Sequence, residues 1–300
     1  MKTQNTHVAT ASKIALLTAC FFWAVSFVAI KVALETVPAL TVVSFRLIIS
    51  AVCFLIWLAI RRPALEIGRP AWLGKLLLLS LFGTGLHYAL QTIGIGMTTA
   101  SNASIYAATG PVLITIIAAL FLGERITGRK AAGIATALSG VLVVMGVDKL
   151  LIFELKGHLL GDLLVFSSIL MWAVFTVMGK GMTRRMSALD ITTVVTIMGA
   201  IYMAPPGIIA LSRAPVTLAT IPLKAWAAIV FLGVTCSFLA TLLYVYALEK
   251  SESQKVGVYL YTIPPMTVII ASIYLNETIG FNLIIGALAV LIGVYLTEKG

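Results

Sequence analysis

Long apolar runs dominate the chain, and short polar segments separate them. Apart from Arg46, nine runs contain no Asp, Glu, Lys or Arg: 14–30, 36–60, 76–123, 131–147, 163–179, 191–212, 225–248, 256–276 and 278–297. Because about 20 mainly apolar residues suffice for one membrane-spanning helix, each run predicts one span. The run 76–123 is long enough for two, with a turn in the Gly- and Thr-rich segment 94–102. The pattern predicts an all-α polytopic membrane protein with ten transmembrane helices.

The composition supports this prediction and excludes a soluble globular protein. Of the 300 residues, 60% are hydrophobic and 11% are charged, and the mean hydropathy is +1.07. A soluble domain carries roughly 25% charged residues. The three cysteines, at positions 20, 53 and 236, lie in apolar runs without metal-ligand or disulfide spacing. We therefore predict no metal site and no cofactor.

Basic residues are distributed unevenly between the predicted loops. Lys and Arg outnumber Asp and Glu by 21 to 11, which we attribute to loop charges that orient a membrane protein rather than to nucleic-acid binding. If the N-terminus is cytoplasmic, fifteen basic residues fall on the cytoplasmic side and five on the opposite side. The positive-inside rule then predicts that both termini are cytoplasmic.

An internal duplication divides the chain into residues 1–150 and 151–300. Five residues recur at an offset of 153: Tyr106, Pro111, Glu124, Gly133 and Gly140 return as Tyr259, Pro264, Glu277, Gly286 and Gly293. A second set recurs at an offset of 149: Trp23-Ala24-Val25, Val28 and Lys31 return as Trp172-Ala173-Val174, Val177 and Lys180. Five spans in each half would insert the second half in the opposite direction. Such inverted repeats are typical of secondary transporters.

The repeated residues also carry a family resemblance. Each half resembles the EamA module of the drug/metabolite transporter superfamily, with a Trp-rich first helix ending in Lys, an Arg in the second helix, and Pro followed by Leu-Gly-Glu in the fourth. The matching residues are Trp23 to Lys31, Arg46, Pro111, Leu122-Gly123-Glu124, Trp172 to Lys180, Pro264 and Leu275-Asn276-Glu277. The second half departs from the pattern, because Val195 stands where Arg46 does and Asn276 replaces Gly.

The resemblance implies two EamA-like repeats, of spans one to five and six to ten, in a basket-like fold with a central cavity. Among relatives, the chain looks most similar to bacterial inner-membrane exporters of amino acids, including the aromatic amino-acid exporter group. The resemblance therefore implies an inner-membrane location, the lipid bilayer as surroundings and a small-molecule substrate such as an amino acid. The sequence itself identifies no protein partner.

Polar side chains inside the spans are candidates for binding a substrate. In the third span, Thr84, His87, Tyr88 and Gln91 follow the spacing of one helical face. In the eighth span, the corresponding face carries Ser237, Thr241 and Tyr244. Because lipid cannot satisfy polar groups, these faces should point into the helix bundle. They either bind substrate or join helices by hydrogen bonds, and we predict substrate binding.

Four aromatic residues are predicted to line the same site: Tyr106, Tyr259, Trp23 and Trp172. The two tyrosines precede Pro111 and Pro264, which break a helix and free a backbone carbonyl. Such a break serves either a cavity or packing alone. The two tryptophans lie well inside their spans, as part of either the cavity wall or the core.

Charged residues lie mainly at the predicted ends of the spans. Lys31 and Lys180 are expected to anchor helix ends, and Glu124 and Glu277 to cap them. Arg46 lies about 12 Å along its helix. It is a functional candidate by its depth, although we expect it to hold backbone carbonyls of a neighbouring helix.

The eleven acidic residues all fall at predicted span ends or in loops. We therefore expect a nearly neutral binding site of hydroxyls, an amide and aromatic rings, which suits a zwitterion.

Together these features predict a secondary transporter that exports small amphipathic metabolites, above all neutral or aromatic amino acids, by alternating access. The alternatives are a passive channel or an exporter of other small metabolites or drugs. Enzymatic motifs such as His-Glu-x-x-His and Gly-x-Ser-x-Gly are absent from the sequence, so we predict no catalysis. His87 is the one side chain at the membrane centre whose usual pKa is near neutrality. We expect it to contact substrate, with transport running downhill.

Overall fold

The structure, a computed structural model, describes residues 2–61, 72–123, 125–145, 158–180, 182, 186–250 and 259–299. Helices make up most of this part of the chain, and it contains no β-strand. The first half holds α1 (Lys2–Leu34), α2 (Ala39–Arg61), α3 (Leu73–Ser80), η2 (Leu81–Leu86), α4 (His87–Met97), α5 (Ala100–Ala107), α6 (Gly110–Leu122) and α7 (Gly128–Met145). The second half holds α9 (His158–Lys180), α10 (Ala188–Ser212), α11 (Leu223–Val230), η3 (Phe231–Leu239), α12 (Ala240–Lys250), α14 (Ile263–Tyr274) and α15 (Phe281–Lys299).

Among the described residues, eight helical segments are long and apolar enough to cross a membrane. They coincide with the first eight predicted spans: Ala11–Leu34, Ala39–Ile60, Leu73–Met97, Ala100–Phe121, Gly128–Met145, His158–Gly179, Ala188–Ser212 and Leu223–Ala247. Two shorter apolar helices, Ile263–Tyr274 and Phe281–Thr297, occupy the places predicted for spans nine and ten. The all-helical architecture is confirmed, whereas the count of ten spans and the inverted orientation stay predictions.

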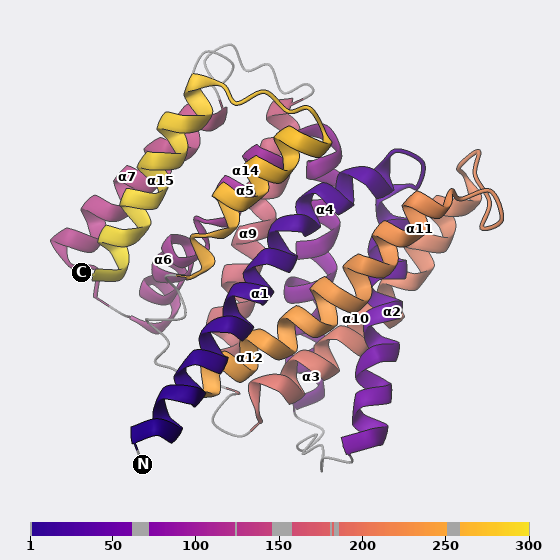
Figure 1. Ribbon diagram of the computed structural model, residues 1–300, viewed down its shortest axis with the longest axis horizontal. Helices are drawn as coiled ribbons and strands as arrows, with labels where there is room; N and C mark the ends of the chain where they lie inside the picture. The colour runs from indigo at the N-terminus through magenta and orange to yellow at the C-terminus, as the bar shows by residue number, and fades with distance from the viewer. Residues whose placement is uncertain are drawn as a thin grey trace.

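The two halves pack against each other reciprocally. The first span (α1) contacts the eighth (η3 and α12), and the sixth span (α9) contacts the third (η2 and α4). Spans two and seven (α2 and α10) pack together, as do spans five and ten (α7 and α15), which lie side by side at the left of Figure 1. Elements far apart in the sequence therefore meet in matched pairs across the boundary between the halves.

The repeated glycines form the joint between α7 and α15. A Cβ atom on Gly140 would lie 2.7 Å from the Gly286 carbonyl oxygen, and one on Gly293 would lie 2.6 Å from the Gly133 carbonyl oxygen. Such distances are too short for any side chain, so the two backbones touch directly. Small residues allow this close approach between membrane helices, which explains why both copies of the repeat carry the same glycine pair.

The third and eighth spans each contain a π-helical segment. η2 and η3 overlap when shifted by the repeat offset, because residues 81–86 correspond to 234–239. At the end of η2, the His87 N–H donates to the Phe82 carbonyl five residues earlier. A π-helical turn contains more residues than an α-helical turn and often occurs at functional sites. Here it rotates the side chains before it relative to those after it.

The breaks predicted in spans four and nine are present. α5 ends at Ala107 and α6 begins with Pro111 in its first turn, while α14 has prolines in its first turn. At both breaks a threonine hydroxyl donates to the tyrosine carbonyl at 2.6 Å, Thr109 to Tyr106 and Thr262 to Tyr259. The Tyr106 and Tyr259 carbonyls, at the residues where the two helices break, are thus satisfied locally.

Gly123 and Asn276 occupy equivalent positions after spans four and nine and share an unusual backbone conformation. Gly123 has φ 67° and Asn276 has φ 52°, both in the left-handed region. Glycine adopts this region without steric cost and asparagine tolerates it better than most residues. The departure from the Leu-Gly-Glu motif therefore preserves the turn that follows each helix.

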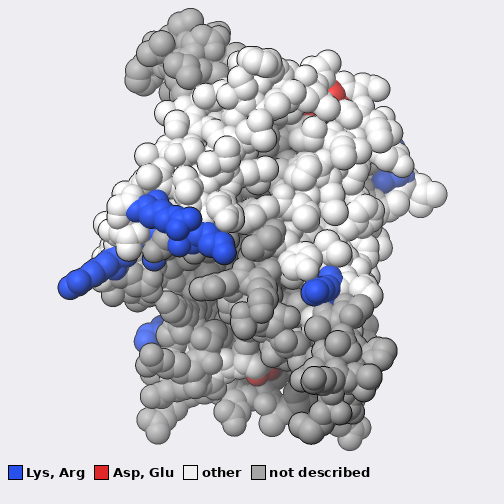
Figure 2. Space-filling model, turned by 60° about the vertical axis from the view of Figure 1, so that its left-hand side comes forward, with Lys and Arg blue, Asp and Glu red and all other residues white. Residues whose placement is uncertain are grey.

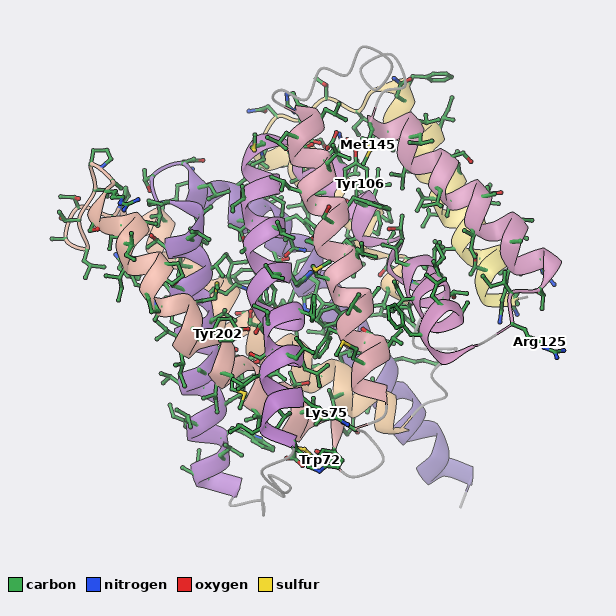
Figure 3. All side chains as sticks on the ribbon, turned by 180° about the vertical axis from the view of Figure 1, so that it is seen from behind. Trp72, Lys75, Tyr106, Arg125, Met145 and Tyr202 are labelled. Carbon is green, nitrogen blue, oxygen red and sulfur yellow. The ribbon has the colours of Figure 1, made fainter. Side chains whose placement is uncertain are left out.

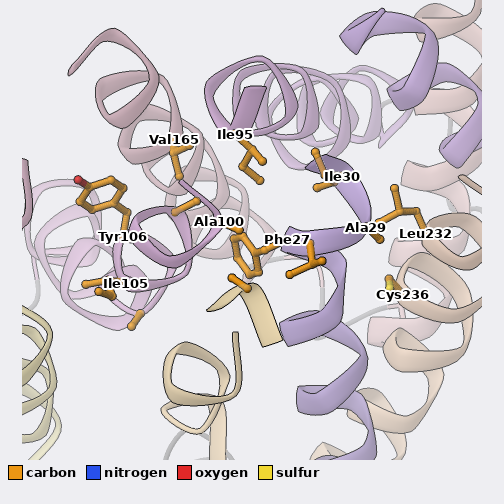
Figure 4. Packing of buried hydrophobic residues seen from close by; sticks show 14 of the residues in the cluster. Phe27, Ala29, Ile30, Ile95, Ala100, Ile105, Tyr106, Val165, Leu232 and Cys236 are labelled. Atoms are coloured by element: carbon orange, nitrogen blue, oxygen red, sulfur yellow. The ribbon is translucent and has the colours of Figure 1, made fainter. Parts of the chain in front are cut away.

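The surface is mainly apolar, and the core runs between the halves. Figure 2 shows a face on which residues other than Lys, Arg, Asp and Glu cover most of the described surface. Large side chains such as Leu120, Phe121 and Ile201 are strongly exposed, as expected where lipid surrounds a protein. The main buried cluster joins α1, the α5 region, α9 and η3, as Figure 4 shows for Phe27, Tyr106, Val165 and Leu232.

Candidate functional site

Arg46 lies at the contact between α2, α4 and η3. Its side chain is 3% exposed. The Nε–H donates to the Ser237 hydroxyl at 2.6 Å, and the guanidinium carbon lies 4.2 Å from the centre of the Tyr88 ring. Arg46 therefore contacts a hydroxyl and an aromatic face, whereas we expected it to hold backbone carbonyls. The expectation of nearly neutral surroundings for the predicted substrate residues is also wrong, because this guanidinium lies against two of them.

His87 connects the first half to the second. Its Nδ1 lies 2.8 Å from the carbonyl oxygen of Ser168 on α9. Because a carbonyl oxygen only accepts, Nδ1 carries the hydrogen, and in the neutral ring Nε2 keeps a lone pair. The imidazole also packs against Tyr88 and Trp172, with ring centres 5.0 Å and 5.3 Å away. Trp172 continues the aromatic row to Phe175 at 5.1 Å.

A second aromatic pair crosses the boundary between the halves. Trp23 on α1 packs against Tyr244 on α12, with ring centres 5.2 Å apart. The Trp23 indole N–H donates to the Cys236 carbonyl at 3.1 Å. Trp23 and Trp172 are equivalent in the repeat, so each pairs with a polar aromatic residue of the other half.

The Thr84 hydroxyl belongs to a hydrogen-bond network between η2 and α10. It donates to the Ser80 carbonyl at 2.7 Å and lies 3.3 Å from both the Val195 carbonyl and the Tyr202 hydroxyl. Ser80 donates to the same Val195 carbonyl at 2.7 Å. Figure 3 labels Tyr202, which α10 contributes to this hydroxyl network. We expected Thr84 to bind substrate together with His87, Tyr88 and Gln91, and in the structure its hydroxyl is engaged by α10, the helix against which Tyr88 also packs.

Gln91 and Thr241 have few polar contacts within the described residues. Gln91 is buried at 9% exposure, and no hydrogen bond joins its amide to another described side chain or backbone group. Thr241 donates to the Ser237 carbonyl at 2.9 Å, within its own helical region. Within the described part of the chain, the hydrogen-bonding capacity of the Gln91 amide is therefore unused.

Tyr106 belongs to a different environment from Arg46 and His87. It is fully buried in the main apolar cluster, beside Asp162 of α9. The Thr98 hydroxyl donates to an Asp162 carboxylate oxygen. Asp162 is 1% exposed and lies within the span His158–Gly179. Asp162 thus lies at a span end, as we expected for every acid, but the sequence did not indicate that its carboxylate is buried. Only the packing of α9 against the end of α4 reveals it.

Tyr259 lies beside α1 and α12. It is half-buried, packs in a small cluster with Leu16 and Tyr244, and its carbonyl accepts from the Cys20 thiol at 3.4 Å. Tyr259 thus lies near the Trp23–Tyr244 pair, whereas its repeat equivalent Tyr106 does not.

Glu277 caps the N-terminus of α5 from the other half. Its Oε1 accepts from the Ala100 N–H at 2.7 Å, and its Oε2 accepts from the Ser101 N–H at 3.0 Å and the Ser101 hydroxyl at 2.6 Å. Lys31 of α1 interacts electrostatically with the same carboxylate. The expected capping role is thus present, but on a helix distant in sequence. Glu124 and the Lys180 side chain lie outside the described residues.

In the described part of the chain, no group of three or more His, Cys, Asp or Glu residues could hold a metal ion. The site that remains combines one cation, a neutral imidazole nitrogen, an amide and several aromatic faces. This set can bind a small molecule with a carboxylate and an apolar body, through charge-assisted hydrogen bonds and ring contacts. Ser237, Tyr244 and Trp172 come from the second half, and Arg46, His87 and Trp23 from the first.

Comparisons with known proteins agree with this architecture. The EamA-like transporter family matches residues 11–146 and 159–298. An "Uncharacterized transporter" of Archaeoglobus fulgidus is 32% identical over 275 residues, which cover 92% of this chain and 93% of the relative. A "Probable terminal-alkyne amino-acid exporter" of Streptantibioticus cattleyicolor is 27% identical over 295 residues, covering 95% and 92%.

A solved crystal structure has the same fold, with a TM-score of 0.66 at 17% sequence identity, and the match covers 96% of this chain and 98% of that chain. The two family matches coincide with the two halves of the duplication. They include both tryptophans, Arg46 and the capping residue Glu277. The chain is therefore an integral membrane protein that belongs to the EamA-like transporter family.

Proposed function

We propose that the chain is a secondary transporter that exports small amphipathic metabolites, in the first place neutral and aromatic amino acids, across the cytoplasmic membrane. The substrate binds between the two halves, and the halves rock against each other to expose this site to one side at a time. Both termini are cytoplasmic. The printed name of the Streptantibioticus relative supports an amino acid as substrate.

The observation that carries this proposal is that predicted substrate residues of each half contact residues of the other half. His87 meets Trp172, Trp23 meets Tyr244, and Ser237 meets the Arg46 guanidinium. A motion of one half against the other separates the two members of every pair. A ligand held between them therefore interacts differently with each arrangement, which is the condition for a ligand to shift such an equilibrium.

Transport runs downhill along the substrate gradient, and His87 acts as a contact for the substrate. Its Nδ1–H is engaged by the Ser168 carbonyl, so Nε2 is the nitrogen available to accept a hydrogen bond from a substrate ammonium. Liposome uptake with and without an imposed pH gradient tests this step. Concentrative uptake that requires the gradient and disappears in His87→Gln would instead make His87 the proton carrier.

Counterflow in liposomes tests the carrier function itself. Purified protein is reconstituted into liposomes loaded with unlabelled L-phenylalanine, and uptake of labelled L-phenylalanine is followed over time. A carrier gives a transient overshoot of label inside, whereas a passive channel gives only equilibration. L-Leucine, L-threonine and the cationic dye ethidium serve as competitors. Inhibition by the amino acids indicates an amino-acid exporter, whereas inhibition by ethidium indicates an exporter of drugs.

Two variants link the activity to the site. Gln91→Ala and Tyr244→Ala should reduce the overshoot at unchanged protein yield. Ile201→Ala is the matched control, because Ile201 is 69% exposed on α10, and should transport normally. Normal counterflow in both site variants would show that these side chains pack the helices and do not bind substrate.

A further inference from the structure

The Arg46 guanidinium has unused hydrogen-bonding capacity inside the protein. A guanidinium carries five N–H donors. Among the described residues, its one hydrogen bond runs from Nε to the Ser237 hydroxyl, and Nη1 is buried without any partner. The Tyr88 ring covers one face of the group at 4.2 Å. The side chain is therefore fixed at Nε and over its face, and Nη1 has no acceptor among the described residues.

No carboxylate of the described residues lies within ion-pair distance of Arg46, the one described ion pair being that of Lys224 with Glu35. A buried charge without a counter-charge costs several kcal/mol. Unpaired charges inside membrane proteins mark substrate or ion sites for this reason. The arrangement has the donor half of a bidentate carboxylate site and lacks the acceptor half.

The equivalent joint in the other half shows that packing does not require this charge. By the repeat, Val195 corresponds to Arg46 and Thr84 to Ser237. There, α10 is joined to α3 and η2 by the Ser80 and Thr84 hydroxyls, which share the Val195 carbonyl. Neutral hydrogen bonds are thus sufficient to join the second span of one half (α10) to the third span of the other half (α3 and η2). The guanidinium in the other joint must serve a different purpose.

We propose that the Nη edge of Arg46 binds the carboxylate of the transported molecule, so that the substrates are carboxylic acids with an apolar or aromatic body. Ser237 and Tyr88 are positioning residues that hold the guanidinium plane. This inference rests on the proposed function and narrows its substrate class. An amino acid and the corresponding simple acid both fit, whereas an amine that lacks the carboxylate leaves Nη1 unpaired and adds a second positive charge.

Ligand protection of the purified protein tests the proposal independently of transport. The probes are L-phenylalanine, 3-phenylpropionate and phenethylamine, which share the same phenylethyl body. Their apparent dissociation constants are obtained from the concentration dependence of thermal protection in detergent. Because hydrogen bonds to charged groups contribute about 1.5–3 kcal/mol, both acids should bind roughly 10- to 100-fold more tightly than the amine.

Variants locate this preference at Arg46. Arg46→Gln should abolish the preference for the two acids. Arg46→Lys keeps the charge but loses the planar fork, and should reduce the preference severalfold. It also tests the proposal if the Gln variant fails to fold. Arg213→Gln is the matched control, because Arg213 lies in an exposed turn after α10, and should bind all three probes as the wild type does.

The outcomes separate this inference from the proposed function. Selective protection by the acids without counterflow would support the site and refute the transporter. Counterflow of L-phenylalanine with an unchanged acid preference in both Arg46 variants would support the transporter and overturn the site. Equal protection of the wild type by all three probes, or by none, would also overturn the role assigned to Arg46.

Discussion

Glu277→Gln should open the start of α5. The first amides of a helix have no carbonyl partner within it, and the capping threonine, Thr99, accepts from the Asn102 N–H rather than from Ala100 or Ser101. Glu277 supplies the missing acceptors through its two carboxylate oxygens. Replacing one oxygen with an NH2 group places a donor against a donor, whichever way the amide is turned.

The smallest expected loss follows from the better of the two amide orientations. If the amide oxygen stays on Ser101, the Ala100 N–H loses a 2.7 Å bond to a charged acceptor, which contributes about 1.5–3 kcal/mol. Losing the negative charge at a helix N-terminus costs about 0.3–1 kcal/mol more. We therefore expect local opening to become easier by at least about 2 kcal/mol, which is roughly a 30-fold change in an equilibrium constant.

Hydrogen exchange followed by mass spectrometry measures this change directly. Protection of the peptide that contains residues 98–106 should fall at least about 30-fold in Glu277→Gln. Glu35→Gln is the matched control, because Glu35 forms an exposed ion pair with Lys224 at 2.9 Å, and such pairs contribute about 0–1 kcal/mol. Unchanged protection in Glu277→Gln, or equal changes in the two variants, would refute the cap.

Three further substitutions have expected outcomes that follow from the contacts. Gly140→Val should lower the free energy of unfolding by about 1–3 kcal/mol, because a Cβ atom there would lie 2.7 Å from the Gly286 carbonyl oxygen. Gly128→Val on the same helix is the control and should not meet this clash, because a Cβ atom there meets nothing within 4 Å. Thermal unfolding in detergent compares the two variants. At the left-handed position 276, Asn276→Val should cost about 1–2 kcal/mol and Asn276→Gly should cost nothing, by the same assay. Thr84→Val should lower thermal stability and leave counterflow per folded molecule intact, because its hydroxyl joins η2 to α10; loss of counterflow at unchanged stability would return Thr84 to the substrate site.

The sequence predicted the helices and their breaks because these depend on local properties. Apolar runs determine where a helix can cross a membrane, and Pro111 and Pro264 determine where a helix must begin again. The repeated glycines could be recognised as a pattern, but their contact between α7 and α15 could not. That contact depends on which spans are neighbours, and the sequence does not show this directly.

The candidate site was predicted less completely, for two physical reasons. The spacing of residues within one helix does not indicate which neighbouring helix they meet, so the partners of the Thr84 hydroxyl on α10 could not be predicted. Burial of Asp162 depends on the end of α4 packing over the start of α9, where Thr98 donates to it. A residue near the end of a predicted span can therefore be buried, and no periodicity in the sequence indicates that.

The two copies of the repeat indicate which residues perform a structural role. Where both halves need the same joint or turn, the residues match: the glycine pairs of α7 and α15, Thr109 and Thr262 at the breaks, and the left-handed turn after each fourth helix of a half. Where the two copies differ, the half that lacks a residue still forms the same helix contact, so that contact does not require the residue. Val195 joins α10 to η2 through its backbone alone, and Ala240 stands in place of His87. Arg46 and His87 are thus the positions at which the first half carries chemistry that the shared fold does not require, and both face the second half.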